Sequence, residues 1–341
     1  MLKSILWKDG KVVIIDQTKL PASLEYRVLE NIDDVAEAIK SMRVRGAPLI
    51  GVTAALGLAL VAYKYRDMNR DHVINKLEKA AGILRKTRPT AVNLFYAIDR
   101  VMSSVYSSSN PAEAAINEAL KIYNEDIEAN RRMAELGASL IDDGDVILTH
   151  CNTGSLATVS IGTALGAIIY AHNQGKKIKV YATETRPKMQ GSRLTMFELI
   201  NAGVDAYLIP DTAVAYTFMY KNINKVFVGA DRILMDGTLY NKIGTFQIAL
   251  IAKFFNAEFY TVAPFSTIDL KSKRGEVIIE ERSKDELIFI NGVQTAPMDA
   301  KVFNPAFDMT PPEFITAIVT DKGIIRPPFG EGIRKILKGG N

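Results

Sequence analysis

The pattern of apolar and polar residues divides the chain into parts that favour different secondary structure. Residues 1 to about 30 alternate as strands, and residues 12–15 form an apolar run directly after the Asp9-Gly10 turn. Residues 31 to about 141 follow a helical pattern instead. Within them, Asn110-Pro111 supplies a capping residue followed by proline at the first helical position. We therefore expect N-terminal strands followed by a helical domain.

A nearly uniform apolar stretch lies at residues 47–63, with basic residues on both flanks. Its length is at the short limit for a helix that crosses a bilayer. No second stretch of this kind follows, and the flanking sequence has ordinary composition for a globular protein. We interpret the stretch as a helix that is buried on all sides within the helical domain.

From Asp145 onward the pattern changes to strands and helices in alternation. Apolar strand candidates are residues 146–149, 178–183, 206–209, 226–229 and 259–263, and helical stretches include residues 157–171 and 245–255. This alternation predicts a parallel sheet with helices on both faces, where ligands bind beyond the carboxyl ends of the strands. The sequence thus predicts an α/β protein with two domains. They are an N-terminal strand and helical domain over residues 1–141 and a Rossmann-like catalytic domain over residues 142–341.

Composition narrows the possible functions. The chain of 341 residues exceeds what one hydrophobic core usually organises, which agrees with two domains. The net charge of +4 is too small an excess to indicate a nucleic-acid partner, and we expect no membrane partner either. One cysteine excludes an intrachain disulfide, and three scattered histidines leave no zinc pattern. A reducing cytoplasm therefore fits this sequence best.

The most informative residue is that single cysteine, Cys151. It follows the strand candidate at residues 146–149 and precedes a Gly154-Ser155 turn. A thiol between a strand and a helix lies near the positive end of the helix dipole, where thiolate is favoured and anions bind. The alternative is a small buried hydrophobe, as many lone cysteines are. His150 precedes it, but adjacent strand residues point to opposite faces, so we assign His150 no role.

Two arginines precede apolar helical stretches in the N-terminal part. Arg45 is followed by Gly46, which lets backbone amides approach a ligand closely, and by Pro48, which suits a first helical turn. Arg88 stands before a similar proline and apolar stretch. An arginine beside a helix N-terminus is suited to binding phosphate. The alternative for both is a solvated arginine at a helix start.

Further polar segments follow the later strand candidates. Asp231 ends one of them, where burial can raise a carboxyl pKa and make a general acid or base. Alternatively, Asp231 caps a helix or pairs with Arg232. Asn241 and Lys242 could hold a phosphate or a sugar hydroxyl. The Gly-containing polar loop around Gln190 suits a cover over a polar ligand, although charged surface loops have the same composition.

Together these segments resemble methylthioribose-1-phosphate isomerase, a family homologous to the regulatory subunits of eukaryotic initiation factor 2B and to ribose-1,5-bisphosphate isomerase. The resemblance covers nearly the whole chain, and its motifs stand in family order. They are Val44-Arg-Gly-Ala-Pro48, Thr149-His-Cys-Asn-Thr-Gly154, Glu184-Thr-Arg-Pro187, Gln190-Gly-Ser-Arg193, Gly229-Ala-Asp-Arg232, Asn241-Lys-Ile-Gly244 and Asn304-Pro-Ala-Phe-Asp308.

The resemblance implies that Cys151 and Asp231 are the catalytic pair. It also implies that substrate is bound by Arg45, Gly46, Ala47, Arg88, Gln190, Asn241 and Lys242. No metal and no cofactor are expected, and the implied assembly is a homodimer formed largely by the C-terminal domains. The sequence departs from the family in small ways. Thr183 stands where the family usually has aspartate, and alanines are replaced by Thr153, Ser155 and Ser192.

The implied activity is an aldose-ketose isomerisation of methionine salvage, from 5-methylthioribose 1-phosphate to 5-methylthioribulose 1-phosphate. Phosphate on carbon 1 locks the sugar as a furanose, so ring opening needs protonation of the ring oxygen, with Asp231 as candidate acid. Hydrogen then moves from carbon 2 to carbon 1. Either Cys151 acts as base in a proton relay through an enol phosphate, or it stabilises the charge in a hydride shift. The sequence leaves both routes open.

Three other functions are compatible with parts of the sequence. Ribose-1,5-bisphosphate isomerase is the closest rival, although a second phosphate would require more basic residues in the pocket. A noncatalytic regulatory subunit of the initiation factor 2B type shares the implied fold, but the retention of Cys151 and Asp231 argues against it. A dinucleotide-binding dehydrogenase would explain the alternating C-terminal part, but the sequence lacks the full Gly-x-Gly-x-x-Gly fingerprint.

Overall fold

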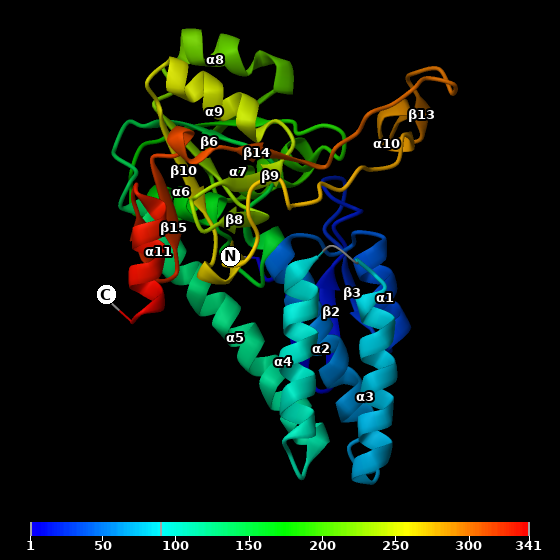
Figure 1. Cartoon of the computed structure of the whole chain (residues 1–341). Helices are drawn as coiled ribbons and strands as arrows, with labels where there is room; N and C mark the ends of the chain where they lie inside the picture. Colours follow the sequence, from blue (N-terminus) through cyan, green and yellow to red (C-terminus); the bar gives the residue numbers. More distant parts are fainter. Residues whose placement is uncertain (1, 89–90, 340–341) are drawn as a thin grey trace. The chain divides into compact units, whose positions relative to one another are not determined.

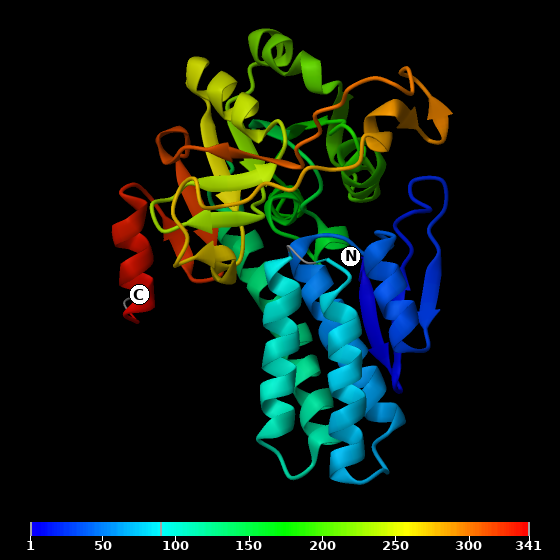
Figure 2. The same cartoon turned by 45° about the vertical axis from the view of Figure 1, so that its right-hand side comes forward.

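A computed structural model describes residues 2–88 and 91–339 of the chain. The chain forms two compact units, which Figures 1 and 2 show in two views. Unit 1 comprises Met1–Arg131 and Thr153–Gly162, and unit 2 comprises Arg132–Asn152 and Thr163–Asn341. The chain therefore enters unit 2, returns to unit 1 after Asn152, and leaves it again after Gly162. The expected domains, residues 1–141 and 142–341, stay a prediction.

Unit 1 begins with an antiparallel sheet in the order β1-β2-β3. Its strands are β1 (Ile5–Lys8), β2 (Lys11–Ile15) and β3 (Tyr26–Leu29). Asp9 and Gly10 both have positive φ in the turn between the first two strands, where Lys8 pairs with Lys11. The expected strand at residues 12–15 and the turn before it are confirmed.

Helices follow the sheet in unit 1. They are α1 (Ile32–Lys40), α2 (Ala47–Lys64), α3 (Arg70–Arg85), α4 (Val92–Tyr106) and α5 (Pro111–Ala138), the last of which continues into unit 2. Asn31, Asn69 and Asn110 start α1, α3 and α5, and the side-chain oxygen of each accepts a backbone N–H from the first turn. The capping pattern that the sequence predicts at Asn110-Pro111 is therefore confirmed.

Helix α2 lies in the core of unit 1. Every residue from 49 to 62 is buried, and the helix packs against α1, α3 and α4. By length and composition α2 could cross a membrane, but 78% of this stretch is buried inside the structure. The interpretation of residues 47–63 as a buried core helix is confirmed.

The segment after Cys151 differs from its prediction. The sequence predicts a helix over residues 157–171, but the structure has a single 3-10 turn at Ser155–Ala157, and helix α6 begins only at Ala164. The prediction is thus wrong for residues 157–163. Residues 157–162 belong to unit 1, whereas Thr163 and α6 belong to unit 2.

Long-range hydrogen bonds explain why this segment is not helical. The side chains of Ser4 and Gln17 donate to the carbonyl oxygens of Ser155 and Leu156 at 2.6 and 2.7 Å. The backbone N–H of Val159 donates to Asp126 at 2.8 Å. These bonds fix the backbone at residues 155, 156 and 159 against distant parts of unit 1, so tertiary structure overrides the local apolar pattern.

The main sheet of unit 2 has the order β16-β15-β10-β7-β4-β5-β6, and its pairs are parallel except for β15 with β16. The strands are β4 (Val146–Thr149), β5 (Lys179–Thr183), β6 (Asp205–Ile209), β7 (Lys225–Val228), β10 (Glu258–Val262), β15 (Ala317–Thr320) and β16 (Gly323–Ile325). The strand candidates from the sequence agree with β4, β5, β6, β7 and β10 to within one residue at each end.

The strand order reverses between β4 and β7. From β4 the chain continues outward through β5 to β6, and from β7 it continues the other way through β10 to β15. Right-handed crossovers place the helices of the two halves on opposite faces of such a sheet. The helices between these strands are α6 (Ala164–Asn173), α7 (Met196–Asn201), α8 (Val214–Lys221) and α9 (Thr245–Phe254), and α11 (Phe329–Leu337) follows the last strand. The expected α/β fold with a Rossmann-like C-terminal part is confirmed.

A second sheet in unit 2 has the order β11-β8-β9-β14. Its strands are β8 (Arg232–Leu234), β9 (Leu239–Lys242), β11 (Ile268–Asp269) and β14 (Phe307–Thr310). Between β11 and β14 the chain forms an extended arm, which Figure 2 shows projecting from the rest of unit 2. The arm contains α10 (Asp285–Ile288), β12 (Phe289–Ile290) and β13 (Val293–Gln294).

Candidate active site

The candidate residues of unit 2 gather at one edge of its main sheet. Thr149 of β4 pairs in register with Ala182 of β5 and with Phe227 of β7, so the carboxyl ends of these parallel strands lie side by side. Cys151 follows β4 and Asp231 follows β7, on the two sides of the point where the strand order reverses. In open parallel sheets this point forms the crevice in which ligands bind.

Cys151 is half-buried and has a φ of 65°, in the left-handed region. Its backbone N–H donates to Thr185 Oγ1 at 2.9 Å, and its carbonyl accepts from Thr195 Oγ1 at 2.6 Å. The predicted location of the thiol at a helix N-terminus is wrong, because α6 begins only at Ala164. Hydroxyl groups that follow the neighbouring strand β5 hold the cysteine backbone instead.

His150 is buried beside Cys151, but it is not placed to act on the thiol. Its Nδ1 lies 2.6 Å from Thr183 Oγ1, and its Nε2 lies 2.9 Å from the carbonyl oxygen of Ile243. Burial lowers the pKa of His150 to about 4, so the ring is neutral near pH 7. Because both ring nitrogens are engaged by other groups, neither serves as a base for Cys151.

Asp231 is exposed, although the sequence-based argument for a general acid assumed that it would be buried. Its backbone N–H donates to the carbonyl of Tyr240 at 3.0 Å, which fixes the start of the β8–β9 hairpin. Arg232, which the sequence suggested as a partner of Asp231, donates to Asp269 at 2.8 Å. Asp231 also begins no helix. The position of Asp231 after β7 therefore supports a role at the edge of the sheet. The argument from burial does not apply, because the residue is exposed.

Asn241 and Lys242 end β9, directly before the turn into α9. Asn241 is buried and its Nδ2 donates to Thr245 Oγ1 at 3.0 Å. Lys242 Nζ donates to the carbonyl of Ala306 at 3.0 Å and lies 4.6 Å from the centre of the Phe307 ring. Both side chains therefore have internal partners that orient them, and a ligand would share or displace these contacts.

Asp308 of β14 supports the same segment. Its carboxylate accepts the backbone N–H of Gly244 at 2.7 Å and that of Phe246 at 3.2 Å, at the N-terminus of α9. Burial raises the pKa of Asp308 to about 6, although these N–H groups and the nearby Lys242 favour the charged form. A carboxylate from a distant strand thus occupies the positive end of α9.

Gln190 lies in the loop between β5 and α7 and is buried. Its side-chain oxygen has no hydrogen-bond partner within residues 2–88 and 91–339. Next to it, a Cβ on Gly191 would lie 1.7 Å from the carbonyl oxygen of Thr183, so only glycine lets the loop pack this closely on β5. Buried acceptors rarely remain unpaired, and an unpaired one in a polar loop points to an absent hydrogen-bond donor.

The candidates in unit 1 lie at helix starts. Arg45, Gly46 and Ala47 are half-buried at the N-terminus of α2. Gly46 has a φ of 93°, and a Cβ there would lie 2.6 Å from the carbonyl oxygen of Ala157, so glycine is required. Arg88 is half-buried before α4, and the Pro89 and Thr90 of its motif lie outside the described residues.

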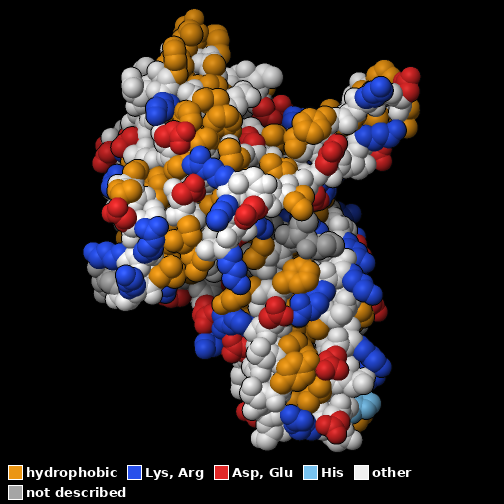
Figure 3. Space-filling model, viewed as in Figure 1, with side chains coloured by type: hydrophobic (Ala, Val, Ile, Leu, Met, Phe, Trp, Pro, Cys, Tyr) orange, Lys and Arg blue, Asp and Glu red, His pale blue; other side chains and the backbone are white. Residues whose placement is uncertain are grey.

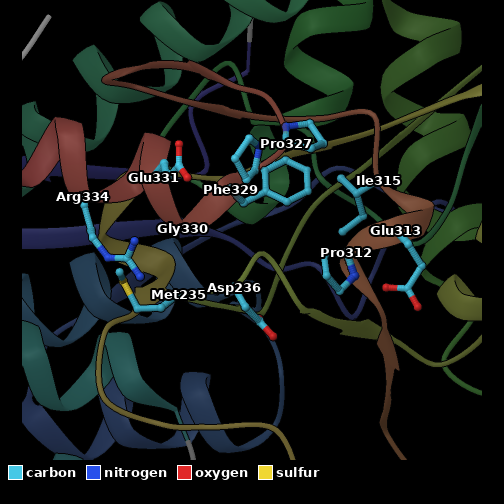
Figure 4. Close-up of a pocket in the computed structure, with 11 residues that line it drawn as sticks. Met235, Asp236, Pro312, Glu313, Ile315, Pro327, Phe329, Gly330, Glu331 and Arg334 are labelled. Carbon is cyan, nitrogen blue, oxygen red and sulfur yellow. The ribbon is translucent and has the colours of Figure 1, made fainter.

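A pocket of about 770 Å³ lies elsewhere in unit 2, between the start of α11 and the β8–β9 turn (Figure 4). Phe329, Ile315 and three prolines line it together with Asp236, Glu331 and Arg334. None of its lining residues is a candidate site residue. Within the described part of the chain, no three His, Cys, Asp or Glu side chains come together as a metal-binding cluster.

Sequence reasoning assigned no role to several residues that shape this edge. Thr183 and Thr185 hold His150 and Cys151, and Asp308 holds the start of α9. The signal for Asp308 was its place in a recognised motif, and the signal for Thr183 was its departure from the family pattern. His150 also lies in one of the family motifs, but the local sequence could not indicate its partners, which lie 33 and 93 residues away in the chain.

Known proteins match this chain over almost its full length. The family model described as "Initiation factor 2 subunit family" matches residues 43–327. A protein of Caldanaerobacter subterraneus subsp. tengcongensis named "Methylthioribose-1-phosphate isomerase" is 50% identical over 341 residues, 98% of this chain and 99% of the relative. The similarity therefore includes both units.

Solved structures give the same result for the fold. The crystal structure of 5-methylthioribose 1-phosphate isomerase from Pyrococcus horikoshii OT3 matches with a TM-score of 0.94 and 40% identity, covering 100% of this chain and 97% of that one. A structure from A. fulgidus described as translation initiation factor eIF-2B, subunit delta, matches with a TM-score of 0.91 and 47% identity, covering 99% and 100%. Enzymes and initiation factors are thus both named among close matches, so the site residues have to separate the two functions.

Proposed function

The chain belongs to the initiation factor 2 subunit family, and on this premise we propose that it is a methylthioribose-1-phosphate isomerase. The reaction converts 5-methylthioribose 1-phosphate, an aldose, into 5-methylthioribulose 1-phosphate, a ketose, as a step of methionine salvage. One observation carries the choice of an enzyme over a regulatory subunit. Cys151 and Asp231 flank the reversal point of the sheet, where a ligand would contact both.

We propose that Asp231 opens the sugar ring. The phosphate on carbon 1 prevents opening through a free anomeric hydroxyl, so the ring oxygen must receive a proton while its bond to carbon 1 breaks. Asp231 gives that proton and can recover one from the hydroxyl on carbon 2, which becomes the ketone. Asp231 is exposed in the structure, so the bound sugar itself would have to exclude water from the carboxyl.

Cys151 is then the candidate for the hydrogen transfer from carbon 2 to carbon 1. In a proton relay, the thiolate removes the proton from carbon 2, forms an enol phosphate and returns a proton to carbon 1. In a hydride shift, the hydrogen moves with its electron pair, and Cys151 stabilises the cationic centre. Turnover in D₂O separates the routes, because only the relay lets solvent deuterium reach carbon 1 of the product.

The remaining candidates would bind the substrate. We propose that Arg45 and the backbone at Gly46 and Ala47 bind the phosphate, because an arginine beside a helix N-terminus offers charge-assisted donors. The unpaired, buried oxygen of Gln190 supports a hydrogen bond to a sugar hydroxyl. Asn241, Lys242 and Arg88 complete the proposed binding set.

A turnover assay on the purified protein tests the function. We expect conversion of 5-methylthioribose 1-phosphate, followed by the ketone carbon signal in NMR, at a kcat/KM well above that for ribose 1,5-bisphosphate. A preference for the bisphosphate would favour the alternative isomerase. Absence of turnover with both sugars, in a folded sample, would favour a noncatalytic regulatory subunit.

We also propose a homodimer formed by unit 2. Exposed apolar side chains gather on two adjacent helices, and Figure 3 shows apolar side chains over α8 at the top of the view. This α8/α9 patch consists of Tyr216, Met219, Tyr220, Leu250 and Phe254, the last of which is 80% exposed. Apolar surface of this kind is commonly covered in a two-fold interface.

Light scattering at micromolar concentration tests the homodimer. We expect twice the chain mass of 37.6 kDa, and a shift toward the single-chain mass in Phe254→Asp. Phe303→Asp is the matched control, because Phe303 is 79% exposed on the arm and lies outside the α8/α9 patch. A mass near 37.6 kDa with full isomerase activity would contradict the proposal.

We propose that the protein works in the cytoplasm, with a small sugar phosphate as its partner rather than nucleic acid or a membrane. A single half-buried cysteine suits a reducing compartment. The small net charge of +4 offers no strong attraction to nucleic acid. Fractionation of the source cells, followed by an activity measurement in each fraction, tests this location.

A further inference from the structure

We propose that His150, Thr183 and Thr185 are positioning residues for Cys151. Together they form one directed hydrogen-bond chain from the backbone N–H of Cys151 to the carbonyl of Ile243. The proposal rests on the proposed function only in giving Cys151 a part in the reaction. The hydrogen-bond chain itself stands on distances and burial within unit 2.

Backbone strain at Cys151 and Thr185 indicates that neighbouring groups fix the conformation of both residues. Cys151 and Thr185 have φ values of 65° and 63°, in a region that residues other than glycine seldom adopt. Thr185 is β-branched, for which this conformation is particularly unfavourable. Such a conformation is unfavourable and persists only where neighbouring groups determine it. Here the Cys151 N–H donates to the Thr185 hydroxyl at 2.9 Å, which joins the two strained residues directly.

The direction of the hydrogen-bond chain follows from its ends. A carbonyl can only accept, so the Nε2 of His150, 2.9 Å from the Ile243 oxygen, must carry the ring proton. The neutral ring then accepts at Nδ1, and the Thr183 hydroxyl donates to it at 2.6 Å. Thr183 in turn accepts from the Thr185 hydroxyl at 3.1 Å. Thr185 accepts from the Cys151 N–H, which completes the chain.

A competing contact exists at one link. The Thr185 hydroxyl also lies 3.3 Å from the carbonyl oxygen of Thr183, which is longer than its 3.1 Å contact with the Thr183 hydroxyl. Either contact ties Thr185 to β5, but only the shorter one continues toward His150. The tautomer of His150 does not depend on this choice, because the Ile243 carbonyl alone fixes it.

The hydrogen-bond chain connects the candidate catalytic cysteine, Cys151, with the candidate binding segment at Asn241 and Lys242. Ile243 follows Lys242 and precedes Gly244, whose missing Cβ would lie only 3.3 Å from the His150 ring. The ring therefore fills the space between the end of β4 and the turn into α9. Because its pKa is lowered to about 4, His150 does this without adding a charge. Small errors in the position of a reacting group cost large factors in rate, so a rigid link here has a functional purpose.

The first test reads the tautomer directly in the unmodified protein. Nitrogen-15 NMR at pH 7 should show a ring with unprotonated Nδ1 and protonated Nε2. The chain has three histidines, so replacing His72 and His172 by Gln assigns the remaining ring to His150. A ring protonated at Nδ1, or at both nitrogens, would overturn the hydrogen-bond chain whatever the turnover proves to be.

The second test compares Thr183→Val, which removes the hydroxyl, with Thr183→Ser, which keeps it. We expect Thr183→Val to lower kcat about tenfold with KM changed less than about twofold, and Thr183→Ser to stay within about threefold of the original. The alkylation rate of Cys151 with iodoacetamide should likewise change more in Thr183→Val than in Thr183→Ser. Because Cys151 is the only cysteine, alkylation reports on it without any isomerase assay.

The outcomes separate the two proposals. Equal kcat and equal alkylation rates in Thr183→Val and Thr183→Ser would overturn positioning by the hydroxyl. Full turnover in Cys151→Ala, with the expected His150 ring signals, would instead remove the catalytic cysteine and leave the hydrogen-bond chain intact. If Thr183→Val does not fold, the tautomer measurement on the unmodified protein still decides.

Discussion

Helices α2 and α9 have similar N-termini, but different charged residues lie beside them. Both are apolar, lack an acidic residue in the first turn, and start after a glycine with positive φ, Gly46 at 93° and Gly244 at 101°. At α9, the carboxylate of Asp308 accepts the N–H groups of Gly244 and Phe246. At α2, the residue before the glycine is Arg45, which adds a positive charge to the positive end of the helix.

This difference indicates where an anion should bind. The negative charge that the α9 dipole favours is supplied by Asp308. At α2 the residue before Gly46 is basic, an arrangement suited to binding a phosphate. We infer that the phosphate belongs to α2, and that the fixed start of α9 supports the reacting edge of the sheet.

The largest expected effect separates reaction from binding. Cys151→Ala and Asp231→Asn should each lower kcat by at least about two orders of magnitude, as expected for loss of an acid–base group. Substrate affinity should change little. Asp236→Asn, an exposed acid in the turn of the same β8–β9 hairpin, is the control and should keep its turnover. Near-normal turnover in Asp231→Asn would remove the proposed ring-opening acid.

The second prediction compares the two glycines by stability. Gly46→Ala should lower the free energy of unfolding by about 3 kcal/mol, because strain at positive φ adds to a Cβ 2.6 Å from the Ala157 oxygen. Gly244→Ala meets only the His150 ring edge at 3.3 Å and should cost about 1–2 kcal/mol. Denaturant titrations measure both. A larger loss in Gly244→Ala would contradict the packing described at α2.

The smallest effect concerns pH and Asp308. Its pKa of about 6 exceeds the ordinary value near 4, so between these pH values the folded protein binds a proton that the unfolded chain has lost. The free energy of unfolding should therefore fall as pH rises through this window, by on the order of 1 kcal/mol from this group. Asp308→Asn should remove that part of the slope. Denaturant titrations at pH 4.5 and 7 measure this slope. An equal change in the free energy of unfolding for the original protein and Asp308→Asn would contradict the prediction.

His150 should contribute with the opposite sign. Its pKa of about 4 lies below the ordinary value near 6.5, so the folded protein binds fewer protons than the unfolded chain between them. The free energy of unfolding from this group should rise with pH across that range. His150→Asn should flatten this rise, in contrast to the effect of Asp308→Asn. Equal changes of slope in both variants would show that other groups control acid stability.

The sequence predicted those features that depend on local pattern. The apolar runs placed β4, β5, β7 and α9 to within a residue, and the uniform stretch at residues 47–63 indicated a buried helix. The helix expected over residues 157–171 failed at its start, because Ser4, Gln17 and Asp126 hold that segment from far along the chain. Local periodicity contains no information about such partners.

The site shows the same division. Motifs identified Cys151 and Asp231 as candidates, and topology brings them to one edge of the sheet. The sequence did not indicate that Asp231 is exposed or that Asp308 caps α9. The cap by Asp308 depends on pairing between β9 and β14, where Asn241 lies opposite Asp308, and strand pairing over that distance is set by the whole fold.

Calorimetric titration of 5-methylthioribose 1-phosphate tests most directly the claim that α2 binds the phosphate. Cys151→Ala serves as the background, so that the ligand binds without reacting. In this background Arg45→Ala should weaken binding by about 2 kcal/mol, roughly thirtyfold, and Lys242→Ala by less than about fivefold. Unchanged affinity in Arg45→Ala, or a larger loss in Lys242→Ala, would contradict the assignment of the phosphate to α2.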